Sequence, residues 1–122
     1  MLTMNNILEV TLLNEITVPE DIENMLVNGE EAVKSYKTFR DSVTFTTKRI
    51  ILRDSQGVTG KKVELYSIPY NIINMWSSEN ARGMFDMNAE LELWTRAGQF
   101  KIKLDKKIDI REIDMLIANA TL

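Results

Sequence analysis

The residues best placed to do chemistry in this sequence are three carboxylates, Asp86, Glu90 and Glu92. Glu90 and Glu92 lie in a segment with strand periodicity and point to one face, where carboxylate oxygens could hold a divalent cation. The same periodicity predicts Lys103 opposite Glu92 across a hairpin, which is the arrangement of an ordinary cross-strand ion pair. We therefore predict an ion pair and no metal here.

Other catalytic chemistry is limited by composition, because the 122 residues include no histidine and no cysteine. Without histidine the chain lacks the commonest general base and metal ligand. Without cysteine it has no thiolate nucleophile, no disulfide and no cysteine zinc site. Gly57 and Gly60 are not followed by a helical segment, so no phosphate-binding loop is expected. We predict no enzymatic activity, no catalytic residue and no cofactor.

Two lysine pairs, Lys61-Lys62 and Lys106-Lys107, could contact phosphates. Nucleic-acid binding, however, needs a basic stripe interleaved with exposed aromatic residues. The chain has 15 basic and 18 acidic side chains and a net charge of −3, which does not attract nucleic acid through bulk charge. We predict that these lysines are solvated turn ends and that nucleic acid is not a partner.

Trp94, Trp76 and Lys101 are the predicted interface residues. Trp94 falls on the charged, outward side of a predicted hairpin, with Lys101 expected opposite it. The indole then either packs over the Lys101 stem or anchors an interface, since tryptophan is enriched at binding hot spots. Trp76 shares the parity of Ile72, which leaves a core position and an exposed position both open.

The hairpin that carries Trp94 is predicted from alternating apolar and polar residues at 90–94 and 101–104. Closing the turn at residues 97–98 separates an apolar face from a charged face. The predicted cross-strand pairs are Leu93–Ile102, Leu91–Leu104, Glu92–Lys103 and Trp94–Lys101. A second hairpin, with its turn at residues 47–48, pairs Phe45 with Ile50 and Val43 with Leu52. Further extended segments are expected at 31–40, 63–66 and 72–76.

The two ends of the chain are predicted to be helical. Residues 1–16 are mildly apolar without a clear period, which suits a short amphipathic helix or a packed arm. Thr17 is the expected cap of a helix with Pro19 in its first turn and its end at 28–29. A C-terminal helix starts with Asp109 and Glu112 as a capping box. Its apolar stripe comprises Ile110, Ile113, Leu116 and Ile117.

These elements predict a mainly β fold, a seven-stranded, bent and partly open barrel with a C-terminal capping helix and a short N-terminal helical segment. We expect an N-terminal arm at 1–28 and the barrel with its helix at 29–122, together forming one structural domain. The N-terminus lacks the basic region of a secretory signal, and no segment approaches the roughly 20 apolar residues of a membrane span. We therefore predict a cytoplasmic protein.

Several segments resemble, in order, the short bacterial pleckstrin-homology (PH) family. They are LVNGEE at 26–31, FTTKRIIL at 45–52, QGVTGKKVE at 56–64, SIPY at 67–70, FDMNAELELW at 85–94 and DIREI at 109–113. Residues 1–16 depart from the Gly-rich, short-helix arm of that family. The resemblance implies a seven-stranded bent barrel capped by a helix, symmetric ring-like homo-oligomers, and a biochemical role that is largely unassigned.

Two functions follow as hypotheses. The first is an assembly module that associates with itself, in rings as the resemblance implies, and presents a surface to another protein. The second is a peripheral membrane adaptor that binds anionic lipid headgroups, for which eukaryotic PH domains cluster cations at the first hairpin loop. Here that loop holds Arg40, Asp41 and Ser42 near Lys37, a mixture of charges. We favour the first hypothesis and do not predict membrane lipid as a partner.

Overall fold

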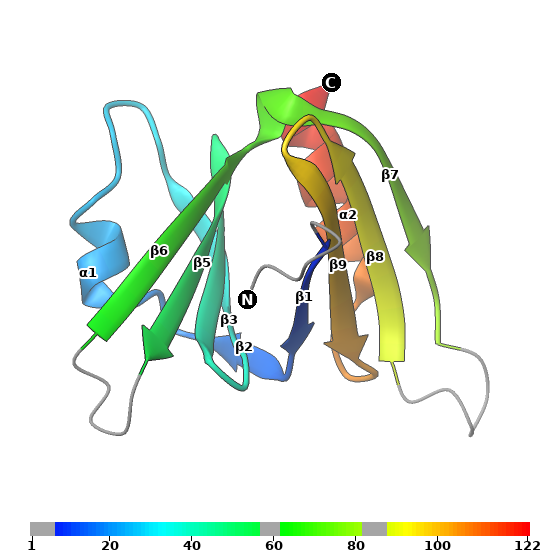
Figure 1. The fold of residues 1–122 in the computed structure, drawn as a ribbon, viewed down its shortest axis with the longest axis horizontal. Helices are drawn as coiled ribbons and strands as arrows, with labels where there is room; N and C mark the ends of the chain where they lie inside the picture. The colour runs from blue at the N-terminus through cyan, green and yellow to red at the C-terminus, as the bar shows by residue number, and fades with distance from the viewer. Residues whose placement is uncertain (1–6, 57–61, 82–87) are drawn as a thin grey trace.

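The computed structural model describes residues 7–56, 62–81 and 88–122, and within them the chain forms two β-sheets and a long C-terminal helix (Figure 1). The five-stranded sheet has the order β2 (Asn14–Ile16), β3 (Ala32–Lys37), β4 (Asp41–Thr46), β5 (Arg49–Gln56) and β6 (Lys62–Pro69). The four-stranded sheet has the order β1 (Ile7–Leu12), β9 (Gly98–Asp105), β8 (Asn88–Thr95) and β7 (Ile73–Glu79). Strands β3–β9 are the seven that the sequence predicts.

The core lies between the inner faces of the two sheets, and helix α2 (Ile110–Thr121) covers it. Ile113 and Ile117 of the predicted stripe are fully buried among strand residues such as Phe45, Leu91 and Leu104. The carboxylate of Asp109 accepts the Arg111 amide at 3.0 Å, so the predicted cap is confirmed. The Glu112 side chain instead pairs with Lys34 on β3, which ties the first turn of α2 to the other sheet.

The two sheets are joined at two corners and are open elsewhere. Leu13 connects β1 to β2, and its amide donates to the Lys37 carbonyl at 2.8 Å. At the other corner, the 3₁₀ turn η1 (Tyr70–Ile72) links β6 to β7. β6 and β7 do not pair with each other; they diverge from η1 to opposite sides of the molecule (Figure 1). The prediction of a partly open barrel is therefore confirmed.

The N-terminal segment is not the helix suggested as one alternative for residues 1–16. Residues 7–12 form β1, which pairs in parallel with β9, and residues 14–16 form β2 beside β3. Residues 8–12 alternate between apolar and polar side chains, as a strand does, but the apolar Leu13 that follows breaks the pattern in the sequence. Leu8, Val10 and Leu12 all face the core, with exposures of 2%, 9% and 0%. Residues 1–6 lie outside the described part of the chain.

Helix α1 (Glu20–Glu23) is shorter than predicted, and Thr17 does not cap it. The helix starts after Pro19 and ends well before residues 28–29, because one long-range hydrogen bond and one local turn use the backbone groups that follow it. The guanidinium of Arg49 donates to the Met25 carbonyl at 3.2 Å, and the Glu30 amide donates to the Val27 carbonyl at 3.0 Å. Gly29 adopts the predicted left-handed conformation, with φ of 79°, in the turn that leads to β3.

The predicted hairpin at the end of the chain forms, but its register is shifted by two residues. The observed pairs are Leu93–Phe100, Leu91–Ile102, Glu92–Lys101, Trp94–Gln99 and Glu90–Lys103. The turn has two residues as predicted but closes one position earlier, on Arg96 and Ala97, where the Thr95 hydroxyl accepts the amides of Ala97 and Gly98 at 3.0 and 3.1 Å. A shift of two keeps the faces and changes every partner. The second hairpin has the predicted pairs, Phe45–Ile50 and Val43–Leu52.

Candidate binding surface

The outer face of the four-stranded sheet carries Trp94 beside an exposed methionine. Trp94 is half-buried and lies opposite Gln99 on β9 and Met75 on β7. Met75 is 53% exposed, so the two side chains form an apolar end to a face that is otherwise charged. Trp94 therefore points outward, as its sequence parity predicts.

The prediction that Lys101 lies opposite Trp94 is wrong, because the register shift places Lys101 opposite Glu92. Its Nζ lies 3.9 Å from Oε1 of Glu90 and 4.0 Å from Oε1 of Glu92. The second oxygen of Glu92 accepts a hydrogen bond from Gln99. Glu90 and Glu92 therefore take part in ion pairs, as predicted. The cation is Lys101, however, and Lys103 pairs with Glu9 and not with Glu92. Asp86 lies outside the described residues, within which no group of three or more acidic side chains gathers as a metal site would require.

Trp76 faces the other side of β7 and holds it to α2. Its indole N–H donates to Asp114 at 3.0 Å, and the Ser78 hydroxyl donates to the other oxygen of that carboxylate. Hydrogen bonds from Ser78 and then from Trp76 lower the pKa of Asp114, against the effect of burial. The structure therefore places Trp94 and Lys101 on one face and Trp76 on the opposite one, so the three predicted interface residues do not form a single cluster.

The loop between β3 and β4 holds few free cations. Arg40 pairs with Asp54, with 3.0 Å between Nε and Oδ1, and the Asp54 side chain is fully buried. Arg53, on the adjacent strand β5, pairs with Asp41 and with Asp21 of α1. At the tip of the loop, Phe39 is 79% exposed.

A buried ion pair, which sequence periodicity does not detect, links Glu30 to Arg49. The Glu30 side chain is fully buried, and its Oε2 accepts Nε of Arg49 at 2.8 Å and the Thr46 hydroxyl at 2.6 Å. Its Oε1 accepts Nη2 of Arg49 and the Val27 amide, both at 3.0 Å. Burial alone would raise the pKa of Glu30, but these hydrogen bonds lower it to about 2. All the acceptor sites of Glu30 are used, so the pair is structural.

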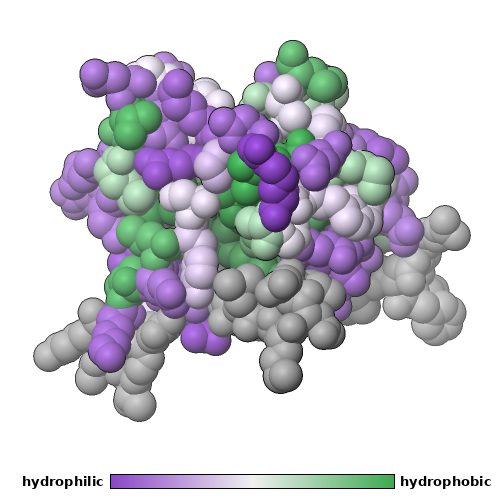
Figure 2. Space-filling model, turned by 45° about the horizontal axis from the view of Figure 1, so that its top comes forward, coloured by the Kyte–Doolittle hydropathy of each residue, from purple (hydrophilic) through white to green (hydrophobic). Residues whose placement is uncertain are grey.

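Each sheet has two edge strands, β1 and β7 in one and β2 and β6 in the other, and β6 and β7 are the pair that lies on opposite sides of the molecule. Each strand has one neighbour in its sheet, β5 for β6 and β8 for β7. On β6, Val63 and Leu65 face outward with exposures of 39% and 41%, while Ile68 is buried. Figure 2 shows green apolar atoms at the surface on its left side, where β6 and α1 lie. Sequence alternation could not identify this edge, because both faces of β6 carry apolar residues.

None of the described helices is long and apolar enough to cross a membrane. The "Bacterial PH domain" family model matches residues 1–121. Two similar proteins from Bacillus subtilis are the uncharacterized proteins YjqA, 39% identical over 83% of this chain and 85% of that protein, and YozO, 35% identical over 83% and 87%.

Solved structures agree with this match. A protein from Shewanella loihica with a pleckstrin-homology domain is 38% identical, with a TM-score of 0.78 over 89% of this chain and 97% of that one. A pleckstrin-homology domain from Shewanella amazonensis is 42% identical, with a TM-score of 0.64 over 84% and 83%. The whole-chain match, the identity to these proteins and the shared fold lead to one conclusion: the chain belongs to the bacterial PH domain family.

Proposed function

We propose that this chain is a non-enzymatic assembly module that associates with copies of itself and presents a surface to other proteins in the cytoplasm. The observation that carries the proposal is that two of the four edge strands, β6 and β7, lie on opposite sides of one small barrel. Unpaired edges expose rows of backbone donors and acceptors that pair readily with another strand. Two unlike edges on one molecule allow head-to-tail contacts, which build rings when the rotation closes.

The side chains on these edges support the same role. Natural edge strands are usually protected from association by charged residues or proline. β6 has Lys62, Glu64 and Pro69 of this kind, but it also presents the exposed Val63 and Leu65, and β7 presents Met75 next to Trp94. Exposed aliphatic and aromatic side chains along an open edge are typical of an interface. A module without histidine or cysteine, whose described acidic residues are mostly in ion pairs, suits binding better than catalysis.

Self-association is tested by light scattering over a concentration series. We expect the wild-type mass to exceed that of a monomer, and the variant Val63→Lys/Leu65→Lys to remain monomeric because charges on an edge oppose strand pairing. Trp94→Ala should also reduce the assembled mass while the domain stays folded. Met115→Lys, a substitution at a 58% exposed site on α2, is the matched control and should assemble normally. A wild-type chain that is monomeric at every concentration would contradict the proposal.

The alternative function is a membrane adaptor, and the exposed Phe39 at the tip of the β3–β4 loop is the observation in its favour. Against it, Arg40 already pairs with the buried Asp54, so a lipid phosphate that captured Arg40 would leave a buried carboxylate without its cation. We therefore expect no sedimentation with anionic vesicles at physiological salt. Binding to anionic but not neutral vesicles, weakened by salt and by Phe39→Ser, would support the adaptor instead.

A further inference from the structure

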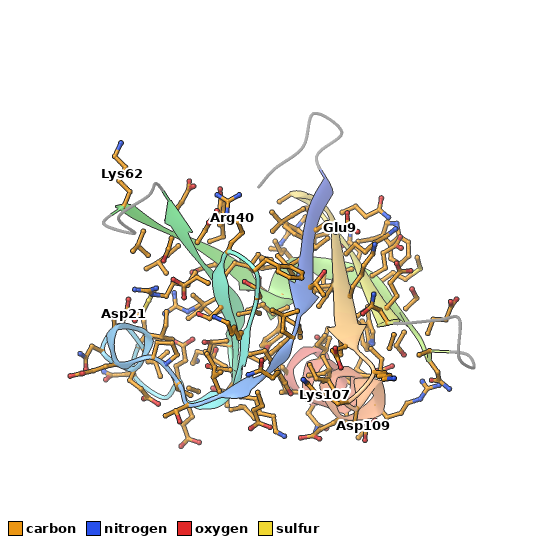
Figure 3. All side chains as sticks on the ribbon, turned by 90° about the horizontal axis from the view of Figure 1, so that it is seen from below. Glu9, Asp21, Arg40, Lys62, Lys107 and Asp109 are labelled. Carbon is orange, nitrogen blue, oxygen red and sulfur yellow. The ribbon has the colours of Figure 1, made fainter. Side chains whose placement is uncertain are left out.

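A cleft of about 330 Å³ lies between the five-stranded sheet and the start of α2, and its volume is within the usual range of small-ligand pockets. Charged and phenolic side chains line it from both sides: Glu15, Lys34 and Tyr36 from β2 and β3, and Lys107, Asp109 and Glu112 from the β9–α2 connection and the first turn of α2. Figure 3 shows Lys107 and Asp109 at this end of α2. The ion pair of Lys34 with Glu112 crosses the cleft and joins its two walls.

Tyr36 forms the floor of the cleft and offers it a hydroxyl group. The residue is only 2% exposed, and its ring packs edge-on against Phe45 in the core, with 6.0 Å between the ring centroids. Because the ring lies in the core, the hydroxyl is the part of Tyr36 that reaches the cleft. No hydrogen bond within the described part of the chain uses this hydroxyl. Buried hydroxyl groups normally have a partner, which here has to come from the cleft.

The charges on the walls of the cleft are mixed and nearly balanced. Three carboxylates, those of Glu15, Asp109 and Glu112, are present with two lysines. Lys34 pairs with Glu112 and lies 3.6 Å from Oε1 of Glu15, whereas no described carboxylate is within ion-pair distance of Lys107. The lysines would oppose a ligand with two positive charges, and the carboxylates would oppose one with two negative charges. A molecule with one charge of each sign suits these walls best.

The floor and the rim of the cleft differ in charge. Burial raises the pKa of Tyr36 to about 12, and the carboxylates nearby add to this rise while Lys34 opposes it. The hydroxyl therefore stays protonated at neutral pH, and its oxygen can accept an ammonium N–H where carboxylates outnumber cations. Lys107 is exposed, so its ammonium group lies at the rim, where it can pair with a carboxylate.

We propose that this cleft binds a small amino-acid zwitterion, a molecule with an ammonium group at one end and a carboxylate at the other. The ammonium group of the ligand donates to the Tyr36 hydroxyl, and its carboxylate pairs with Lys107. Neither contact requires a second copy of the chain, so this binding is independent of the proposed self-association.

An NMR titration with three probes of equal chain length tests this site. The probes are δ-aminovalerate, which carries both charges, pentylamine, which carries only the ammonium group, and valerate, which carries only the carboxylate. We expect saturable shifts of the backbone amides at 109–112, with δ-aminovalerate binding more tightly than pentylamine and valerate not binding. Tyr36→Phe removes only the hydroxyl and should weaken δ-aminovalerate binding about tenfold, the effect of one hydrogen bond to a charged group.

A second variant keeps the test decisive if Tyr36→Phe does not fold. Lys107→Met, a substitution at an exposed site, should weaken δ-aminovalerate to the level of pentylamine and leave pentylamine binding unchanged. Lys106→Met is the matched control, because Lys106 is exposed and does not line this cleft. Absence of saturable shifts with δ-aminovalerate would overturn the proposal. Valerate binding as tightly as pentylamine, or equal effects of Lys106→Met and Lys107→Met, would overturn it as well.

Discussion

Replacing Arg49 with methionine is expected to reduce the free energy of unfolding at neutral pH by about 3–5 kcal/mol, the usual cost of removing one member of a buried ion pair. The substitution leaves the fully buried Glu30 carboxylate with only Thr46 and the Val27 amide as donors. It also removes the bond to the Met25 carbonyl, which holds the segment between α1 and β3. Chemical denaturation followed by circular dichroism measures the loss.

The effect of Arg49→Met should depend on pH. The pKa of Glu30 falls from its ordinary 4.5 to about 2 in the folded protein, so the folded state holds this proton less tightly than the unfolded state. The stabilisation, about 3 kcal/mol, is therefore complete above pH 4.5 and is lost as the pH falls toward 2. The difference between wild type and variant should shrink over the same range. Acid titrations of stability for both proteins give this profile.

Arg96→Met is the matched control, because Arg96 lies in the exposed turn between β8 and β9 and its described hydrogen bond uses only its backbone. Surface substitutions of this kind usually change stability by less than about 0.5 kcal/mol. Arg49→Lys keeps the charge but loses the forked geometry, and it should fall between wild type and Arg49→Met. Equal losses for Arg96→Met and Arg49→Met would show that the buried pair is not what stabilises this region.

Removing residues 1–12 should prevent the barrel from folding. The deletion takes away β1 with the buried Leu8, Val10 and Leu12, and it exposes the edge of β9 and the core beneath. Burial of each side chain contributes about 1.5–3 kcal/mol, so the three account for a large part of the about 5–15 kcal/mol that holds a typical domain together. Amide dispersion in an NMR spectrum and a cooperative unfolding transition should both be lost.

Two milder variants make this result interpretable. Deletion of residues 1–6, which precede β1, should leave the folded spectrum unchanged. Leu12→Ala should fold with a loss of about 2–5 kcal/mol, because the Leu12 side chain is completely buried. A well-dispersed spectrum for the chain without residues 1–12 would mean that β1 is an accessory strand. If instead that chain is unfolded, truncation of the N-terminus cannot be used to locate the assembly interface.

Elements whose residues lie close together in the sequence were predictable. Helix α2 follows from Asp109 and the spacing of its isoleucines, and the β4–β5 hairpin follows from a short turn between matched apolar residues. The register of β8 and β9 was not predictable, because two registers place the same residues on the apolar face. The Thr95 hydroxyl, which bonds to the turn, selects between them. A hydrogen bond made by one side chain leaves no periodic pattern in the sequence from which it could be predicted.

Contacts between segments that are distant in the sequence could not be predicted. Nothing local predicts that β1 pairs with β9, or that Glu30 and Arg49 meet in the interior. For the candidate surface, parity places Trp94 outward but leaves Trp76 undecided, since its position depends on Asp114 of α2. The free edge of β7 becomes visible only once the strand order is known.

The parallel pairing of β1 with β9 has a consequence for how the chain folds during synthesis. Ile7 is paired with Gln99 and Leu12 with Leu104, so β1, the first of the described strands to be synthesised, cannot pair until β9, the last of them, has been made. Contacts between such distant segments slow folding, because loop closure costs entropy before the contacts form. Until β9 emerges, the nascent polypeptide carries Leu8, Val10 and Leu12 without their final cover, a window in which chaperones or neighbouring nascent chains have access to them.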